Sequence, residues 1–97
     1  MEQNDLAEIV PGDIVLSLAG HDKNRLFLVH SIDKKGFLVI IDGRYRKIDK
    51  PKAKNPKHCK VVAKDLSILH LTELKTTTNA EIYKLIQSYK SKILDKE

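Results

Sequence analysis

The 97-residue sequence is poor in the residues that build disulfides, metal sites and membrane spans. Its single cysteine, Cys59, cannot form a disulfide within the chain, and beside His58 it supplies too few ligands for structural zinc. The longest uninterrupted apolar run, Phe37 to Ile41, is far shorter than the roughly 20 residues that cross a bilayer. We therefore expect a solvated free thiol, no metal and no membrane partner.

Aromatic residues are also scarce, at 5% with no tryptophan. This disfavours the aromatic groove of a domain that binds proline-rich peptides. The histidines and glycines stand singly, without metal-ligand spacing, a catalytic triad or a glycine-rich phosphate loop. We expect no catalytic residues and no cofactor, and hence a protein that is not an enzyme.

Length and composition predict one small domain. A chain of 97 residues lies in the size range of a single domain, and 41% hydrophobic residues suffice for a core although 32% are charged. The first residues, Met1 to Asp5, are acidic where a signal peptide would be basic. We expect a cytoplasmic protein with a flexible N-terminus over residues 1–8.

Positive charge is concentrated in one segment. Arg44 to Lys60 contains eight basic residues against Asp49 alone, a net +7, whereas the whole chain carries +5. The remaining 80 residues therefore sum to −2. Such local basicity can neutralise the phosphates of a polyanion and release their counterions. The alternative is a solvated loop that only keeps the protein soluble.

Short apolar segments separated by turn residues predict antiparallel strands. These segments cover residues 14–18, 25–32 and 37–41, and weaker ones cover 60–63 and 67–71. Asp33 to Gly36 has the pattern of a four-residue hairpin loop. Asp42-Gly43 favours a type I′ turn, after which we expect the chain to double back through residues 44–48. Residues 50–57, with two prolines, predict an extended exposed loop.

The last part of the sequence predicts an amphipathic helix. Thr78, with Glu81 three residues later, fits a capping box at a helix start. The apolar residues that follow recur at helical spacing and form one stripe: Ile82, Leu85, Ile86, Tyr89 and Ile93. We expect this stripe to pack on the strands. A partner protein or a second copy of the chain is the alternative, and the oligomeric state stays open.

Residues 12–29, with the sequence GDIVLSLAGHDKNRLFLV, resemble the KOW motif, which spans a strand, a loop with a central glycine and a second strand. Further segments look like the second half of small bacterial KOW-domain RNA-binding proteins, relatives of KOW-bearing large-subunit ribosomal proteins: Asp42-Gly43, Arg46-Lys47, Lys50-Pro51-Lys52, Lys57-His58 and Asn79-Ala80-Glu81-Ile82. This resemblance implies a mainly β fold. It would comprise a small SH3-like barrel of KOW type over residues 9–75, with a basic loop at 44–60, and a C-terminal α-helix within 76–97.

The chain departs from the KOW pattern at Asn24, where the family usually has glycine. Asparagine is the non-glycine residue that best tolerates a left-handed backbone. We therefore expect the turn at Asn24 to be kept, and with it the loop from Gly20 to Arg25. His21, Lys23 and Arg25 in this loop are a second, smaller basic cluster, either an RNA contact or ordinary turn polarity.

The basic segment and the resemblance together predict RNA binding. The resemblance implies ribosomal RNA and the large ribosomal subunit as partners. Arginine can fork onto a phosphate or stack on a base, so Arg44 and Arg46 rank ahead of the lysines. The candidate RNA-binding residues are Arg44, Arg46, Lys47, Lys50, Lys52, Lys54, Lys57, Lys23, Arg25 and Tyr45.

Two alternatives stay open at this stage. In a strand over residues 44–48, Tyr45 would point away from both neighbouring arginines, so its ring either packs into the barrel or stacks on a base. The chain as a whole could instead be a protein-interaction module that docks a partner through the barrel or the helix stripe, without specific RNA binding.

Overall fold

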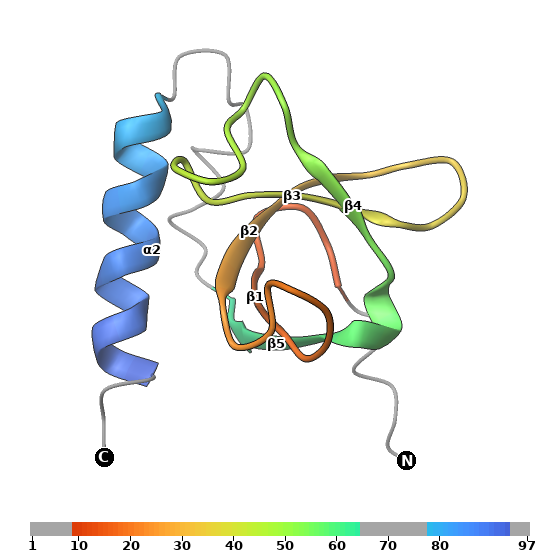
Figure 1. Ribbon diagram of the computed structural model, residues 1–97, viewed down its shortest axis with the longest axis horizontal. Helices are drawn as coiled ribbons and strands as arrows, with labels where there is room; N and C mark the ends of the chain where they lie inside the picture. The colour runs from red at the N-terminus through yellow and green to blue at the C-terminus, as the bar shows by residue number, and fades with distance from the viewer. Residues whose placement is uncertain (1–8, 65–77, 94–97) are drawn as a thin grey trace.

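The computed structural model describes residues 9–64 and 78–93 of the chain, which form a mainly β fold (Figure 1). Five strands make one antiparallel sheet in the order β4-β3-β2-β1-β5, and an α-helix stands beside it. The elements are β1 (Ile14–Ser17), β2 (Leu26–Ile32), β3 (Leu38–Ile41), β4 (Lys52–Lys54), the 3-10 helix η2 (Pro56–His58), β5 (Cys59–Ala63) and α2 (Asn79–Ile93).

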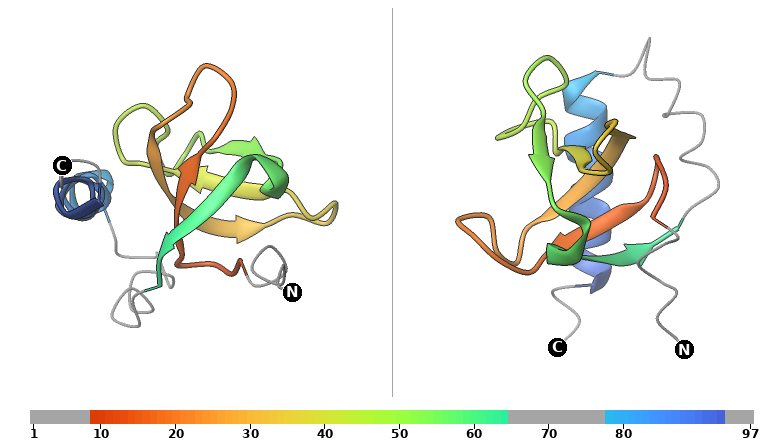
Figure 2. Two further views of the ribbon diagram at one scale, coloured as in Figure 1. Left: turned by 90° about the horizontal axis from the view of Figure 1, so that it is seen from below. Right: turned by 90° about the vertical axis from the view of Figure 1, so that its right-hand side faces the viewer.

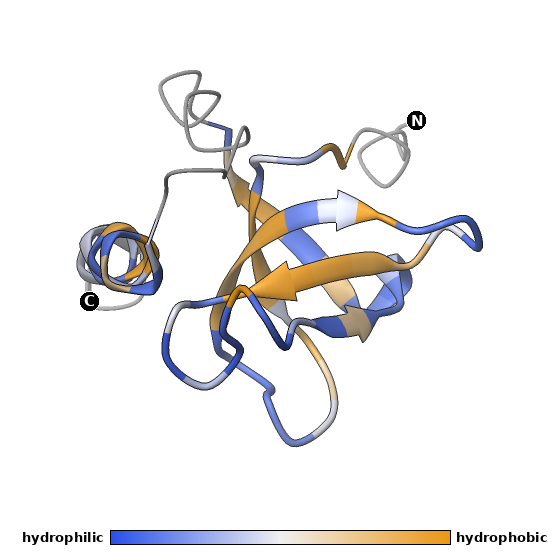
Figure 3. Cartoon of the chain, turned by 90° about the horizontal axis from the view of Figure 1, so that it is seen from above, coloured by the Kyte–Doolittle hydropathy of each residue, from blue (hydrophilic) through white to orange (hydrophobic). Residues whose placement is uncertain are grey.

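The sheet wraps around an apolar core, with α2 on its outside (Figure 2). Successive residues of β2, from Leu26 to Val29, are all buried, because this strand is covered on both faces. Phe27 and Val29 face the inner core with Val15 and Ile40. Apolar residues accordingly fill β3 and most of β1 and β2, whereas the loops are mostly polar (Figure 3). The sheet does not close into a barrel within the described residues, since β4 and β5 remain its two edges.

The helix covers the other face of the sheet. Ile82 and Ile86 of α2 pack against a second apolar cluster that includes Ile14, Leu28 and Ile41. The predicted capping box is confirmed, because Thr78 N donates to Glu81 Oε1 at 2.9 Å and Glu81 N donates to Thr78 Oγ1 at 3.2 Å. The apolar stripe of the helix therefore packs against the sheet of the same chain.

The first three predicted strands are confirmed to within one residue at most ends. The hairpin loop before β3 is also confirmed, with Gly36 at φ +89° and its N–H donating to Asp33 O at 2.9 Å. Asn24 has φ +73°, so the left-handed turn survives without glycine. The predicted segments 1–8 and 67–71 lie outside the described residues.

Four predictions are wrong. Asp42-Gly43 is not a type I′ turn, because Asp42 lacks the positive φ that this turn requires. Residues 44–48 do not form a returning strand. Residues 50–57 are not simply an extended loop, because they contain β4, which pairs with β3. Prolines on either side of β4 are tolerated because it is an edge strand. The Cys59 thiol is not solvated but lies 2% exposed in the inner core, where burial raises its pKa.

Gly43 lets the loop after β3 meet the first turn of α2. Its φ is +80°, and a Cβ built there would collide with Asn79 O and lie 2.7 Å from Tyr83 N, both of them backbone atoms. Gly36, in contrast, has a similar φ of +89° but open space where a Cβ would lie. Substituting each glycine in turn therefore separates the cost of a left-handed backbone, which both positions share, from the cost of a collision with α2, which only Gly43 has.

We expect Gly43→Ala to destabilise the fold more than Gly36→Ala. Gly36→Ala should cost about 1–2 kcal/mol for the left-handed backbone alone. Gly43→Ala should add the collision with α2, for a total of about 3 kcal/mol or more. Urea unfolding followed by circular dichroism measures both, and equal losses in the two variants would contradict the loop–helix contact.

Candidate nucleic-acid interface

A tight loop after β3 presents cationic and aromatic side chains on the surface. Asp42 Oδ1 accepts the backbone N–H groups of Arg44, Tyr45 and Arg46 at 2.9, 2.8 and 2.8 Å. Asp42 itself is only 6% exposed, whereas Tyr45 is 61% exposed. Of the alternatives for Tyr45, packing into a barrel is therefore wrong, because the alternation of a strand does not apply in this loop.

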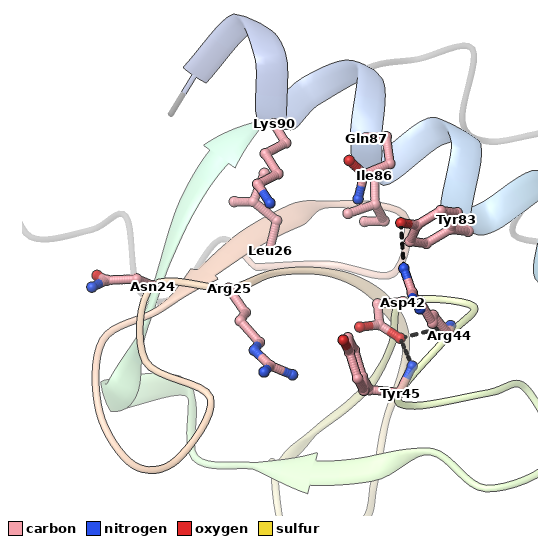
Figure 4. A pocket seen from close by; sticks show the side chains of 10 residues that line it. All are labelled: Asn24, Arg25, Leu26, Asp42, Arg44, Tyr45, Tyr83, Ile86, Gln87 and Lys90. Atoms are coloured by element: carbon pink, nitrogen blue, oxygen red, sulfur yellow. Dashed lines mark hydrogen bonds between the residues drawn. The ribbon is translucent and has the colours of Figure 1, made fainter. Parts of the chain in front are cut away.

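The helix holds the same loop from the other side. Ile48 N donates to Asn79 Oδ1 at 2.8 Å, which ties the end of the loop to the start of α2. Arg44 Nη1 donates to the Tyr83 hydroxyl at 2.9 Å (Figure 4). This hydrogen bond raises the pKa of Arg44 above its ordinary value. An arginine guanidinium is charged at physiological pH in any case.

Arginines and tyrosines alternate along this surface. The Arg25 guanidinium carbon lies 4.4 Å from the centroid of the Tyr45 ring. Arg44 lies 5.5 Å from the centroids of both Tyr45 and Tyr83. All three distances are within the range of about 6 Å for cation–π contacts. The predicted loop cluster and the predicted basic segment thus meet at Arg25, Tyr45 and Arg44, which together with Tyr83 we call the Arg–Tyr ladder.

Two cavities share the Arg25–Tyr45 pair. One, of about 220 Å³, lies between α2 and the loops, with Arg44, Tyr83, Gln87 and Lys90 in its lining (Figure 4). The other, of about 530 Å³, is lined by Arg46, Lys52 and His21 among others. Cationic and aromatic groups around a recess can hold phosphates and stack on bases.

Lys54 is not part of this surface. Its Nζ donates to Asp22 Oδ1 and to Ala19 O, both at 2.8 Å, and the residue is 7% exposed. Lys52 Nζ reaches Asp22 Oδ2 at 2.8 Å and Ser17 Oγ donates to Asp22 Oδ1 at 2.7 Å. Burial alone would raise the pKa of Asp22, but the hydrogen bonds from Lys52, Lys54 and Ser17 outweigh it and hold that pKa well below its usual range.

The other predicted residues are exposed but line neither cavity. They are Lys23, Lys47, Lys50 and Lys57. Lys47 and Lys50 lie in one turn, where Lys50 N donates to Lys47 O at 2.9 Å, and Lys57 lies in η2. The structure therefore gathers Arg25, Arg44, Tyr45, Arg46 and Lys52 and leaves these lysines at the periphery.

Three helix residues at the interface were not predicted from the sequence: Tyr83, Gln87 and Lys90. They recur at spacings of four and three, each one position after a residue of the apolar stripe. This second, polar stripe is the sequence signal that points to them.

Residues 9–64 and 78–93 contain no cluster of three or more His, Cys, Asp or Glu residues able to hold a metal ion. In the same ranges, no helix has the length and apolar character needed to cross a membrane.

Lys54→Met should weaken the fold more than Lys52→Met. Removing the buried Lys54 ammonium leaves part of the Asp22 charge unpaired, at a cost of about 3 kcal/mol. The Lys52 side chain is 29% exposed, so its loss should cost about 1 kcal/mol or less. Thermal unfolding of both variants measures the difference, and a Lys54→Met variant as stable as the unchanged chain would contradict the structural role.

The loss of stability at low pH should report the same interaction of Asp22 with the two lysines. The unfolded chain holds Asp22 at a pKa of about 3.9, and the folded chain holds it lower. Its stabilisation is therefore complete above about pH 4 and is lost as the pH falls from there toward the folded-state pKa. We expect the free energy of unfolding to fall less steeply below pH 4 in Asp22→Asn than in the unchanged chain. Equal slopes would contradict the lowered pKa.

A scan against protein-family models and a search of curated proteins found no match to this chain.

Proposed function

We propose that this protein binds RNA as a KOW-type module, with ribosomal RNA of the large subunit as its target in the cytoplasm. The observation that carries the proposal is the Arg–Tyr ladder, in which Arg25 of the KOW-like loop stacks at 4.4 Å on Tyr45 of the basic segment. Two segments with the expected chemistry thus converge on one surface. The ribosomal target rests on the resemblance alone.

The proposed fold is a small SH3-like barrel. The support is a curled antiparallel sheet whose two edge strands, β4 and β5, are joined by the single 3-10 turn η2. A short connection of this kind carries the chain from one edge of the sheet to the other, as a small barrel requires. The described strands leave the pairing of those edges open.

The charges around the Arg–Tyr ladder favour a polyanion as the ligand. The described acidic residues that line the two cavities are Asp22, which pairs with Lys52 and Lys54, and Asp42, whose Oδ1 accepts three backbone N–H groups. Lys52 and Lys54 balance the charge of Asp22, which leaves Asp42 as the one unbalanced anion of the described lining against Arg25, Arg44 and Arg46, so the surface keeps a net positive charge. Guanidinium groups fork onto phosphates and stack on bases, which suits single-stranded or irregular RNA.

A protein-interaction module is the weaker candidate. The helix stripe was the sequence feature that favoured it, but Ile82 and Ile86 are buried against the sheet at 0% and 4% exposure. The stripe is therefore not free to dock a partner. An acidic protein could still contact the basic surface, but it would leave the stacking geometry of the ladder unused.

We expect the triple variant Arg25→Ala, Arg44→Ala, Arg46→Ala to lose RNA affinity without unfolding, because these three exposed arginines line the two cavities. About five phosphate contacts to single-stranded RNA give a log–log salt slope near −3.5, and removing three should bring it to about −1.4. Fluorescence anisotropy with a labelled RNA across a salt series measures the slope. Co-sedimentation with separated ribosomal subunits tests the target.

A matched control removes three positive charges elsewhere. Lys34→Ala, Lys35→Ala, Lys84→Ala changes exposed residues of the β2–β3 loop and of α2 that line neither cavity. The control should retain RNA binding. If the folded triple variant binds as well as the control, the contact surface is wrong; if the unchanged chain fails to bind RNA at low salt, RNA binding itself is wrong.

A further inference from the structure

The helix contributes one wall of the smaller cavity. Tyr83, Gln87 and Lys90 extend from α2 toward the loops that carry Arg25 and Arg44 (Figure 4). The floor is apolar, because Leu26 and Ile86 line it and are each only 4% exposed. A planar ring can cover such a floor while its edges meet the polar walls.

The size of the cavity suits one ring system. Its volume is about 220 Å³, below the roughly 300–1,000 Å³ of sites that enclose drug-sized ligands. Arg25, Arg44 and Tyr45 of the Arg–Tyr ladder form the opposite wall and offer planar guanidinium and phenol groups. Unpaired bases stack on groups of both kinds.

The polar groups of the wall are available to a ligand. Within the described residues, the Gln87 amide has no hydrogen-bond partner, and it can both donate and accept. Lys90 is exposed and makes no ion pair there. Of the described lining residues only Asp42 is acidic, and its Oδ1 already accepts three backbone N–H groups. The cavity therefore carries net positive charge from Arg25, Arg44 and Lys90.

We propose that this cavity holds one unpaired base of a single-stranded RNA, stacked against the Arg–Tyr ladder. Gln87 contacts the edge of the base and Lys90 an adjacent phosphate. The inference rests on the proposed RNA binding and extends it, since it makes α2 a third RNA-binding element and selects single strands. Bases inside a duplex are stacked on one another and cannot enter such a recess.

The test uses the full chain and two probes: a single-stranded RNA of about ten nucleotides carrying one 2-aminopurine, and the same strand annealed into a duplex. We expect the single strand to bind more tightly, with a change in 2-aminopurine fluorescence as the base stacks. Tyr45→Ala should weaken single-strand binding at least about fivefold, as for the loss of one stacked base, and duplex binding much less.

Two lysines of the same helix provide the matched pair. Lys90→Ala should reduce the steepness of the salt slope by about 0.7, as for one lost phosphate contact. Lys84→Ala makes the same change of charge outside the cavity and should leave the slope unchanged. Gln87→Ala should alter the preference among RNAs of different base composition while keeping the slope, since it removes a neutral contact.

The outcomes separate this inference from RNA binding in general. If the chain binds RNA but Lys90→Ala and Lys84→Ala behave alike, or if duplex and single strand bind equally with unchanged fluorescence, the base-binding cavity is wrong and the proposed function stands. If the unchanged chain binds neither probe at low salt, both are wrong.

Discussion

The organisation of the interface depends on the close approach of Gly43 to the first turn of α2. A side chain at position 43 would occupy the space of helix backbone atoms. Because Gly43 has no side chain, the loop lies close enough to α2 for Asn79 to accept the N–H of Ile48 and for Tyr83 to accept a hydrogen bond from Arg44. Loop and helix are thus joined by three local contacts, and the exposed side chains between them have defined directions.

A second constraint acts through one buried anion. Asp22 binds Lys52 and Lys54 of β4, so the loop between β1 and β2 is held against the far edge of the sheet. This loop ends at Arg25, which stacks on Tyr45. The basic segment therefore contains cations of two kinds. The two lysines bound to Asp22 are buried or half-buried, whereas Arg25, Arg44 and Arg46 are exposed.

The sequence predicts the elements that follow local rules and misses those that depend on distant partners. The three apolar strands, the capping box at Thr78 and the left-handed Asn24 are all local. β4 is not, because Lys-Ala-Lys has a single apolar residue and becomes a strand only by pairing with β3. The burial of Lys54 depends in the same way on Asp22, 32 residues earlier in the chain. The dipeptide Asp42-Gly43 favours a type I′ turn by local rules. In the structure Asp42 Oδ1 instead accepts three backbone N–H groups of the following residues, and Tyr45 is exposed.

The helix α2 contributes residues both to the core and to the candidate site. Ile82 and Ile86 are buried against the sheet, while Tyr83 and Gln87, one position later in each case, line the cavity. Packing of the apolar stripe therefore fixes the orientation of the polar stripe beside it before any ligand arrives. A ligand bound in this cavity would order side chains and not a helix, so it would lose little of its interaction free energy to conformational entropy. A ligand-binding wall built on a packed helix is in this respect better suited to a small recess than a free loop of the same composition.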